Sequence, residues 1–221
     1  MIASPNFDDR LSTNSIDMLV IHYTGMVSAT AALDRLCDPQ AKVSSHYFID
    51  EDGAIIQLVD EDKRAWHAGI SYWRGESDIN ARSIGIELVN PGHEYGYRNF
   101  PKSQIEALID LALGILSRHP IPARNVVGHS DIAPKRKIDP GERFDWSGLA
   151  AEGIGLWPNE FKNDNNYSDF ISMLSEYGYD ISSPSFAITA FQRHFHPETI
   201  NENINSESLG RLKGLIELSN A

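Results

Sequence analysis

The sequence predicts an α/β fold, with a mixed central β-sheet flanked by helices and followed by a small three-helix bundle. Short apolar segments alternate with amphipathic segments over residues 1–158, which is typical of α/β domains. The pair Asp52-Gly53 separates two of the apolar segments and indicates an antiparallel hairpin, so the sheet is expected to be mixed rather than purely parallel. From residue 167 onwards, the apolar residues follow a helical period.

Five short segments of the first part predict the strands of this sheet. Residues 18–22, "MLVIH", form an apolar run of the length of a buried strand. Residues 46–50, "HYFID", and the segment "GAIIQLV" after Asp52 predict the two arms of the hairpin. Residues 83–89, "SIGIELV", and the short segment "NVVGH" at 125–129 predict two further strands.

Two segments of the first part predict helices, over residues 29–36 and 102–118. Pro101 stands at the start of the second segment and Pro120 follows its end, as expected for a helix with these limits. Its apolar residues recur at i, i+3, i+4 and i+7: Ile105, Leu108, Ile109, Ala112, Ile115 and Leu116.

A polar, Asn-rich segment at 159–166, "NEFKNDNN", predicts a linker between two domains. We place a main domain at 1–158 and a helical domain at 167–221. Three amphipathic segments of the second domain, 170–177, 185–195 and 206–218, predict its helices. The polar linker leads us to expect that this bundle has a small core of its own.

The composition excludes some classes of partner and indicates a location for the protein. The formal net charge of −12 argues against a nucleic-acid partner, because phosphate binding depends on lysine and arginine. No apolar run approaches the ~20 residues of a membrane span, and residues 1–14 lack the apolar core of a secretory signal. We expect a monomer in the cytoplasm. A signal peptide in the full-length gene product would instead indicate a periplasmic or outer-membrane-associated protein.

Histidine and carboxylate residues are candidates for a metal site, because Cys37 is the only cysteine. His22 and His129 each close a predicted strand, and Asp139 follows in the loop of "GHSDIAPKRKIDPG". Three such ligands leave a fourth position of a zinc ion open for water. Taken singly, however, a histidine at a strand end is more often a hydrogen-bonded structural residue.

Two charged residues are candidates for catalysis. Glu87 alternates with Ile84, Ile86 and Leu88 in a strand, so it faces away from them, into a cleft or into solvent. Lys137 is two residues before Asp139, so in an extended loop both side chains point to the same side, where a cation would stabilise an oxyanion.

Other polar residues of this region have simpler interpretations. Lys135 and Arg136 are interpreted as part of a solvated basic run, and Asp131 as a turn or capping residue rather than a fourth ligand. Trp66 and His67 lie in "RAWHAG", a segment without helical or strand periodicity. Trp66 is either a platform for a sugar ring or a packed core aromatic.

Five motifs together resemble the zinc N-acetylmuramoyl-L-alanine amidases, a family that includes the amidases of muropeptide recycling and, more distantly, peptidoglycan recognition proteins. The motifs are "VIHYT", "SSHYFIDEDG", "DKRAWHAG", "NARSIGIEL" and "GHSDIAPKRKIDPG". The resemblance covers residues 18 to about 157. It implies that the zinc ligands are His22, His129 and Asp139, that Glu87 is the general base, that Lys137 stabilises the oxyanion, and that the substrate-binding residues are Trp66, His67 and Asn80.

The C-terminal part is similar to a three-helix peptidoglycan-binding module. Gly178 and Tyr179 follow the first predicted helix, and an Ala-x-x-x-Phe-Gln pattern occupies 187–192. The Asp-Gly turn common in that module is replaced by "NENIN".

The resemblance implies a bacterial cell-wall hydrolase that uses Zn²⁺ to cleave the amide bond between N-acetylmuramic acid, or its 1,6-anhydro form, and L-alanine. The alternative is a metal-free protein that only recognises peptidoglycan fragments. An amidase acting on a different acyl peptide also stays open, because the sequence does not show which sugar or stem-peptide groups are contacted.

Overall fold

A computed structural model describes residues 3–11, 15–158 and 166–220. The strands are β1 (Phe7–Asp9), β2 (Met18–Tyr23), β3 (Tyr47–Ile49), β4 (Ile55–Gln57), β5 (Lys63–Ala65), β6 (Ser83–Leu88) and β7 (Val126–Gly128). The helices are α1 (Ala29–Cys37), α2 (Gly92–Tyr95), α3 (Lys102–Arg118), α4 (His129–Ile132), α5 (Trp146–Ala151), α6 (Phe170–Tyr177), α7 (Pro184–Phe195) and α8 (Ser206–Asn220), with short 3-10 turns at Ile79–Ala81 and Ala123–Asn125.

The main sheet is mixed, as the sequence predicts. Its strand order is β4-β3-β6-β2-β7. Strands β3, β6, β2 and β7 pair in parallel, whereas β3 and β4 form the antiparallel hairpin. His22 of β2 is the register partner of Glu87 of β6. Since side chains of register partners share a face, the pairing brings two of the predicted site residues together near the carboxyl ends of the central strands.

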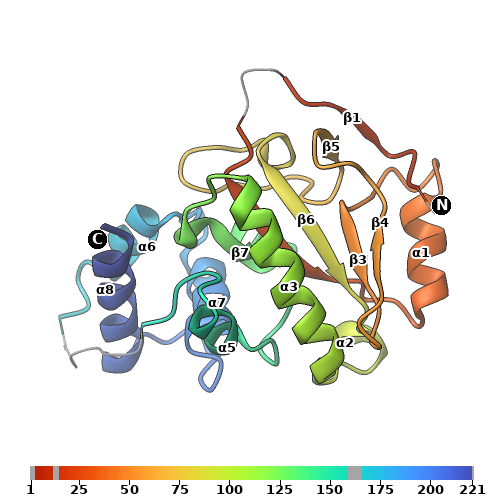
Figure 1. Ribbon diagram of the computed structural model, residues 1–221. Helices are drawn as coiled ribbons and strands as arrows, with labels where there is room; N and C mark the ends of the chain where they lie inside the picture. Colours follow the sequence, from red (N-terminus) through yellow and green to blue (C-terminus); the bar gives the residue numbers. More distant parts are fainter. Residues whose placement is uncertain (1–2, 12–14, 159–165, 221) are drawn as a thin grey trace.

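Helix α3 covers one face of the sheet (Figure 1). Its residues Leu108, Ala112 and Ile115 are buried in one apolar cluster with the alternate residues of β6, among them Ile84 and Ile86. The apolar face of α3 therefore packs against the alternate apolar residues of β6. The side chain of Glu87, which lies between these residues in the strand, points to the opposite face of the sheet.

The apolar core on that opposite face continues into the C-terminal helices. Met18 and Val20 of β2 belong to the same apolar cluster as Phe170 of α6, Phe191 of α7 and Leu209 of α8. We expected a separate core for the bundle; instead, its core is continuous with the sheet, because alternate residues of the buried strand β2 need a cover on both faces. Most of the predicted linker, residues 159–165, lies outside the described residues, and the domain boundaries stay a prediction.

Three local features differ from the predictions. Strands β1 and β5 pair antiparallel beside the main sheet, a pairing that their polar sequences, "FDD" and "KRA", do not indicate. His129 begins helix α4 rather than ending a strand. Helix α5 begins at Trp146, where the side chain of Asp145 caps it by accepting from the Gly148 N–H at 2.8 Å.

Among the described helices, none has the length and apolar character needed to cross a bilayer.

Candidate metal centre and catalytic cavity

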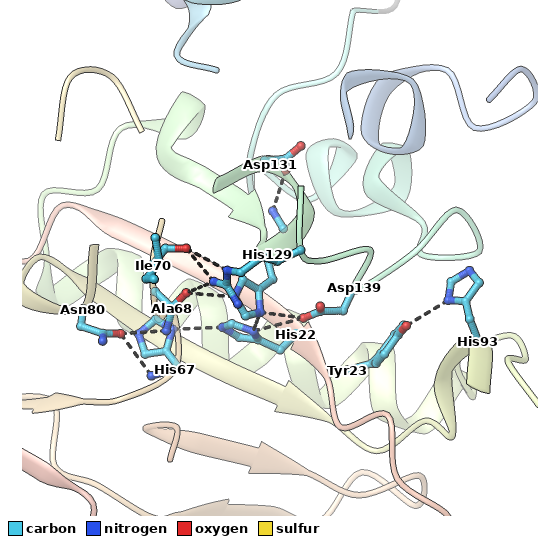
Figure 2. A network of polar contacts seen from close by, with 12 residues as sticks. His22, Tyr23, His67, Ala68, Ile70, Asn80, His93, His129, Asp131 and Asp139 are labelled. Carbon is cyan, nitrogen blue, oxygen red and sulfur yellow. Dashed lines mark hydrogen bonds and ion pairs between the residues drawn. The ribbon is translucent and has the colours of Figure 1, made fainter. Parts of the chain in front are cut away.

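Three buried side chains converge at the carboxyl ends of β2 and β7 (Figure 2). His22 comes from β2, His129 from the first turn of α4, and Asp139 from the loop that follows. The two Nδ1 atoms lie 2.9 Å apart, and the Oδ2 of Asp139 lies 3.2 Å from Nδ1 of His22 and 3.1 Å from Nδ1 of His129.

Hydrogen bonds behind His22 determine which of its nitrogens carries the proton. Ser83 donates its hydroxyl hydrogen to the carbonyl oxygen of Ile79 at 2.7 Å, so its Oγ accepts from Nε2 of His67 at 3.0 Å. The Nδ1 of a neutral His67 then carries no hydrogen and accepts from Nε2 of His22, also at 3.0 Å. The Nδ1 of His22 is consequently a bare lone pair that points at Asp139.

His129 is oriented in the same way. Its Nε2 donates to the carbonyl oxygen of Ala68 at 3.1 Å, and this oxygen also accepts from Arg136 at 2.8 Å. In the neutral imidazole, Nδ1 is then the acceptor and faces the other two side chains. Both histidines are thus held from behind by one segment of chain, residues 67–68.

The electrostatics of this group favour a bound cation. Burial and the neighbouring His129 lower the pKa of His22 to about 4, so the ring is neutral at pH 7. Asp139 is only 5% exposed, so its carboxylate needs a compensating positive charge. Two nitrogen lone pairs and a carboxylate oxygen therefore face one another without a hydrogen between them, an arrangement that a bound cation would stabilise.

The spacing also suits a metal ion. Metal–nitrogen and metal–oxygen bonds of ~2.0–2.2 Å in a tetrahedral site place the ligand atoms about 3.3 Å apart, close to the 2.9–3.2 Å that separates these donors. The group of His22, His129 and Asp139 could therefore bind a metal with little rearrangement.

Glu87 lies beside this group and has the properties of a general base. Its Oε2 is buried and has no hydrogen-bond partner among the described residues. Burial and the nearby Asp139 raise the pKa of Glu87 to about 8, against an opposing effect of Lys137. The carboxyl group can therefore exchange a proton near neutral pH.

A cavity of about 160 Å³ joins these residues to the surface. Glu87, Lys137 and Asp139 line it together, as the two-residue spacing in the loop predicts for Lys137 and Asp139. Half-buried Trp66 also lines the cavity, and its contact with substrate stays a prediction.

His67 also lines this cavity, whereas Asn80 is not among its lining residues, and both side chains are buried. His67 is only 8% exposed and Asn80 7% exposed, and the Oδ1 of Asn80 accepts from the backbone N–H groups of His67 and Ala68 at 3.1 and 2.8 Å. A Cβ at Gly85 would lie 2.5 Å from the imidazole of His67. The glycine of "SIGIEL" therefore makes room for the histidine behind the metal group.

Arg136 is exposed, as expected for a solvated basic run, but its guanidinium is also held by hydrogen bonds. Its guanidinium donates to the carbonyl oxygens of Ala68 and Ile70 (Figure 2), because the loop of "KRK" folds back over the segment that supports His129. Sequence reasoning also missed Tyr23, which lines the cavity and hydrogen-bonds to Nδ1 of His93 at 2.9 Å. Only its place directly after His22 could have pointed to it.

A family model described as N-acetylmuramoyl-L-alanine amidase matches residues 12–142. The N-acetylmuramoyl-L-alanine amidase AmiD of Escherichia coli (strain K12) is 39% identical over an alignment of 232 positions, which covers 91% of this chain and 83% of that protein. The 1,6-anhydro-N-acetylmuramyl-L-alanine amidase AmpD of Haemophilus influenzae is 37% identical over 163 residues, or 66% of this chain and 86% of that protein.

Solved structures agree with these relatives. The complex of Escherichia coli AmiD with the substrate anhydro-N-acetylmuramic acid-L-Ala-D-gamma-Glu-L-Lys superposes with a TM-score of 0.84 and 35% identity, covering 96% of this chain and 98% of that chain. AmpDh3 of Pseudomonas aeruginosa, in complex with anhydromuramic pentapeptide, superposes with a TM-score of 0.82 and 31% identity, covering 99% and 98%. Because these superpositions take in nearly the whole chain, the C-terminal helices are part of the shared fold.

Proposed function

Since the chain belongs to the N-acetylmuramoyl-L-alanine amidase family, we propose that it uses zinc, held by His22, His129 and Asp139, to cleave its substrate. The reaction is hydrolysis of the amide bond between N-acetylmuramic acid, or its 1,6-anhydro form, and L-alanine of peptidoglycan fragments. The observation that carries the proposal is the convergence of three metal-binding atoms in one cavity with Glu87 and Lys137.

Zinc is the metal that this set of donors suits best. Two imidazole nitrogens and one carboxylate oxygen form the usual protein part of a catalytic zinc site, in which one position stays open. When bound, the metal supplies Lewis-acid chemistry, because it lowers the pKa of a water molecule and polarises a carbonyl group.

The chain's own residues then move the protons and stabilise the charge. Glu87, which lines the cavity beside the metal group and is ionised next to a bound cation, accepts a proton from the attacking water and passes the proton to the nitrogen of the leaving L-alanine. Lys137, on the same cavity wall, donates to the oxyanion that forms as water attacks the carbonyl. Trp66 offers an aromatic surface on which the sugar ring packs.

A recognition protein without metal is the alternative function, and the geometry opposes it. Such a protein has no need of two imidazoles whose lone pairs converge on a carboxylate. It also has no need of a buried Glu87 oxygen without a partner, which costs about 1–3 kcal/mol in a folded protein. Both features make sense where a cation and a water molecule are bound.

Metal analysis and product analysis together test the proposal. Protein purified without added zinc should contain about one equivalent of zinc, and mass spectrometry of a digested anhydromuropeptide should show free peptide beginning with L-alanine. The matched control Glu87→Gln should keep the zinc and lose the product. Wild-type protein that binds the muropeptide without zinc and without cleavage would establish the recognition function instead, and cleavage of a different amide would overturn the substrate assignment.

A further inference from the structure

A buried carboxyl group connects the metal centre to the C-terminal helices. Asp131 is 1% exposed. Its Oδ2 accepts from the backbone N–H of Gly128 and from Nδ1 of His194, both at 2.7 Å, and its Oδ1 accepts from the hydroxyl of Tyr179 at 2.8 Å. Two of its three partners therefore come from the chain beyond residue 166.

Asp131 belongs to the short segment that carries the metal ligands. His129 lies two residues earlier in the same four-residue helix, α4, and the backbone N–H of Ser130 donates to the carbonyl oxygen of Asp139 at 2.9 Å. A helix of four residues has no stability of its own, so its position depends on the partners that hold it. Figure 2 shows Asp131 and His129 on this segment.

The contacts around this segment leave little room for adjustment. A Cβ at Gly128 would lie 2.7 Å from Cδ of Pro140, the neighbour of Asp139 in the chain. On the other side, His194 is 3% exposed and its ring stacks on Trp146 with centroids 3.8 Å apart. A displacement of Asp131 is therefore transmitted to the backbone of both Asp139 and His129.

We infer that the C-terminal helices are part of the catalytic unit, in which His194 and Tyr179 position the ligand His129 through the carboxyl group of Asp131. The inference uses the assignment of His129 as a ligand made above. Its physical basis is that removing the Tyr179 hydroxyl leaves the buried Oδ1 without a partner, whereas removing the His194 donor leaves Oδ2 with the Gly128 N–H alone; either change weakens the anchor of α4. His194 and Tyr179 are positioning residues, because neither reaches the cavity wall.

The alternative is that the helices only cover apolar surface, and a second histidine provides the matched control. His196 is 2% exposed and hydrogen-bonds through Nδ1 to Ser208 of α8 at 2.9 Å. It lies two residues from His194 but bonds within the bundle. If the bundle is merely a cover, equivalent substitutions at the two histidines will affect the metal centre equally.

The experiment compares leucine and asparagine at both positions in the full-length zinc protein. Asparagine places an amide nitrogen where Nδ1 was, whereas leucine has the same size and no donor. We expect His194→Leu to weaken zinc binding about tenfold in a chelator competition, as substitutions behind a metal ligand typically do, and to change the absorption spectrum of the cobalt-substituted protein. His194→Asn should recover most of the affinity, while both variants of His196 should change it less than twofold.

A second measurement, which needs no metal, accompanies the chelator competition. In metal-free protein, amide hydrogen exchange in the peptide 128–133 should be faster in His194→Leu than in His196→Leu. Tyr179→Phe, which deletes a single hydroxyl, should act in the same direction if His194→Leu fails to fold. Equal exchange and equal zinc loss for the two histidines would overturn the inference, whereas absence of zinc from the wild-type protein would refute the metal assignment and leave the exchange test to decide the positioning role.

Discussion

Replacing Glu87 with glutamine tests how much free energy the buried carboxyl group costs. Burial and the nearby Asp139 raise its pKa from 4.5 to about 8, so the metal-free folded protein binds this proton more tightly than the unfolded chain does. Stability from this group is fully present below about pH 4.5 and is lost as the pH rises through about 8. Glutamine does not ionise, so the stability of the variant does not fall as the pH rises through this range.

The size of the effect follows from the pKa. A difference of one pKa unit corresponds to ~1.4 kcal/mol, so the whole shift corresponds to about 5 kcal/mol. The Oε2 atom is buried but the residue as a whole is only half-buried, and we therefore discount the figure to about 2 kcal/mol for solvent screening. Between pH 4.5 and pH 9, E87Q should gain this amount relative to wild type, equivalent to ~4–8 °C in Tm.

Urea unfolding of chelator-treated protein at several pH values measures the difference directly. The matched control Glu152→Gln replaces an exposed carboxyl group and should change the free energy of unfolding equally at both ends of the range. Added zinc should shrink the advantage of E87Q, since a nearby cation favours the ionised carboxyl group. A stability difference between E87Q and wild type that stays constant from pH 4.5 to pH 9 would refute the reasoning.

Four further predictions concern the metal ligands, the two catalytic candidates and the C-terminal helices. Alanine at any one of the proposed ligands His22, His129 and Asp139 should abolish the retention of zinc through gel filtration, as measured by elemental analysis. Full retention of zinc in all three variants would contradict the assignment. Glu87→Ala should keep zinc and lower kcat by ~10²–10⁴-fold. Lys137→Ala should lower kcat more than it raises KM, because the oxyanion that Lys137 contacts exists only in the transition state. Steady-state kinetics on a defined muropeptide measure both effects, and a near-normal rate in either variant would contradict the role proposed for that residue. Ending the chain after position 158 exposes the apolar face that β2 shares with the bundle, so we expect aggregation or loss of zinc, whereas a soluble fragment that melts like the full-length protein and cuts muropeptide would show that the helices are dispensable.

Regular periodicity explains what could be predicted of the fold. Helix α3 runs over Lys102–Arg118, the range predicted from its apolar spacing and flanking prolines. Strands β2 and β6 were visible because their buried residues are apolar. The pairing of β1 with β5 was not, because those strands are polar and are held by long-range pairs such as Arg64 with Asp8, which leave no local pattern.

The residues of the site also separate into those that the sequence could predict and those that it could not. Residue type and position indicated His22, Glu87 and Asp139, although only the family motifs made them a coherent set. The support behind them could not be foreseen, because it joins residues far apart in the chain: His67 lies 45 positions from His22, and His194 lies 63 from Asp131. The sequence carries the chemical types of these residues, but the fold determines which of them face one another.

The row of hydrogen bonds behind His22 also restricts where protons can travel. Each donor in it points away from the metal group, from His22 to His67, then to Ser83, and the row ends on the carbonyl oxygen of Ile79. A backbone carbonyl does not take up a proton at neutral pH, so the row is a closed end and not a proton wire. In the proposed reaction, a proton released from water therefore goes to Glu87 rather than into this row, and from Glu87 it reaches the leaving amine.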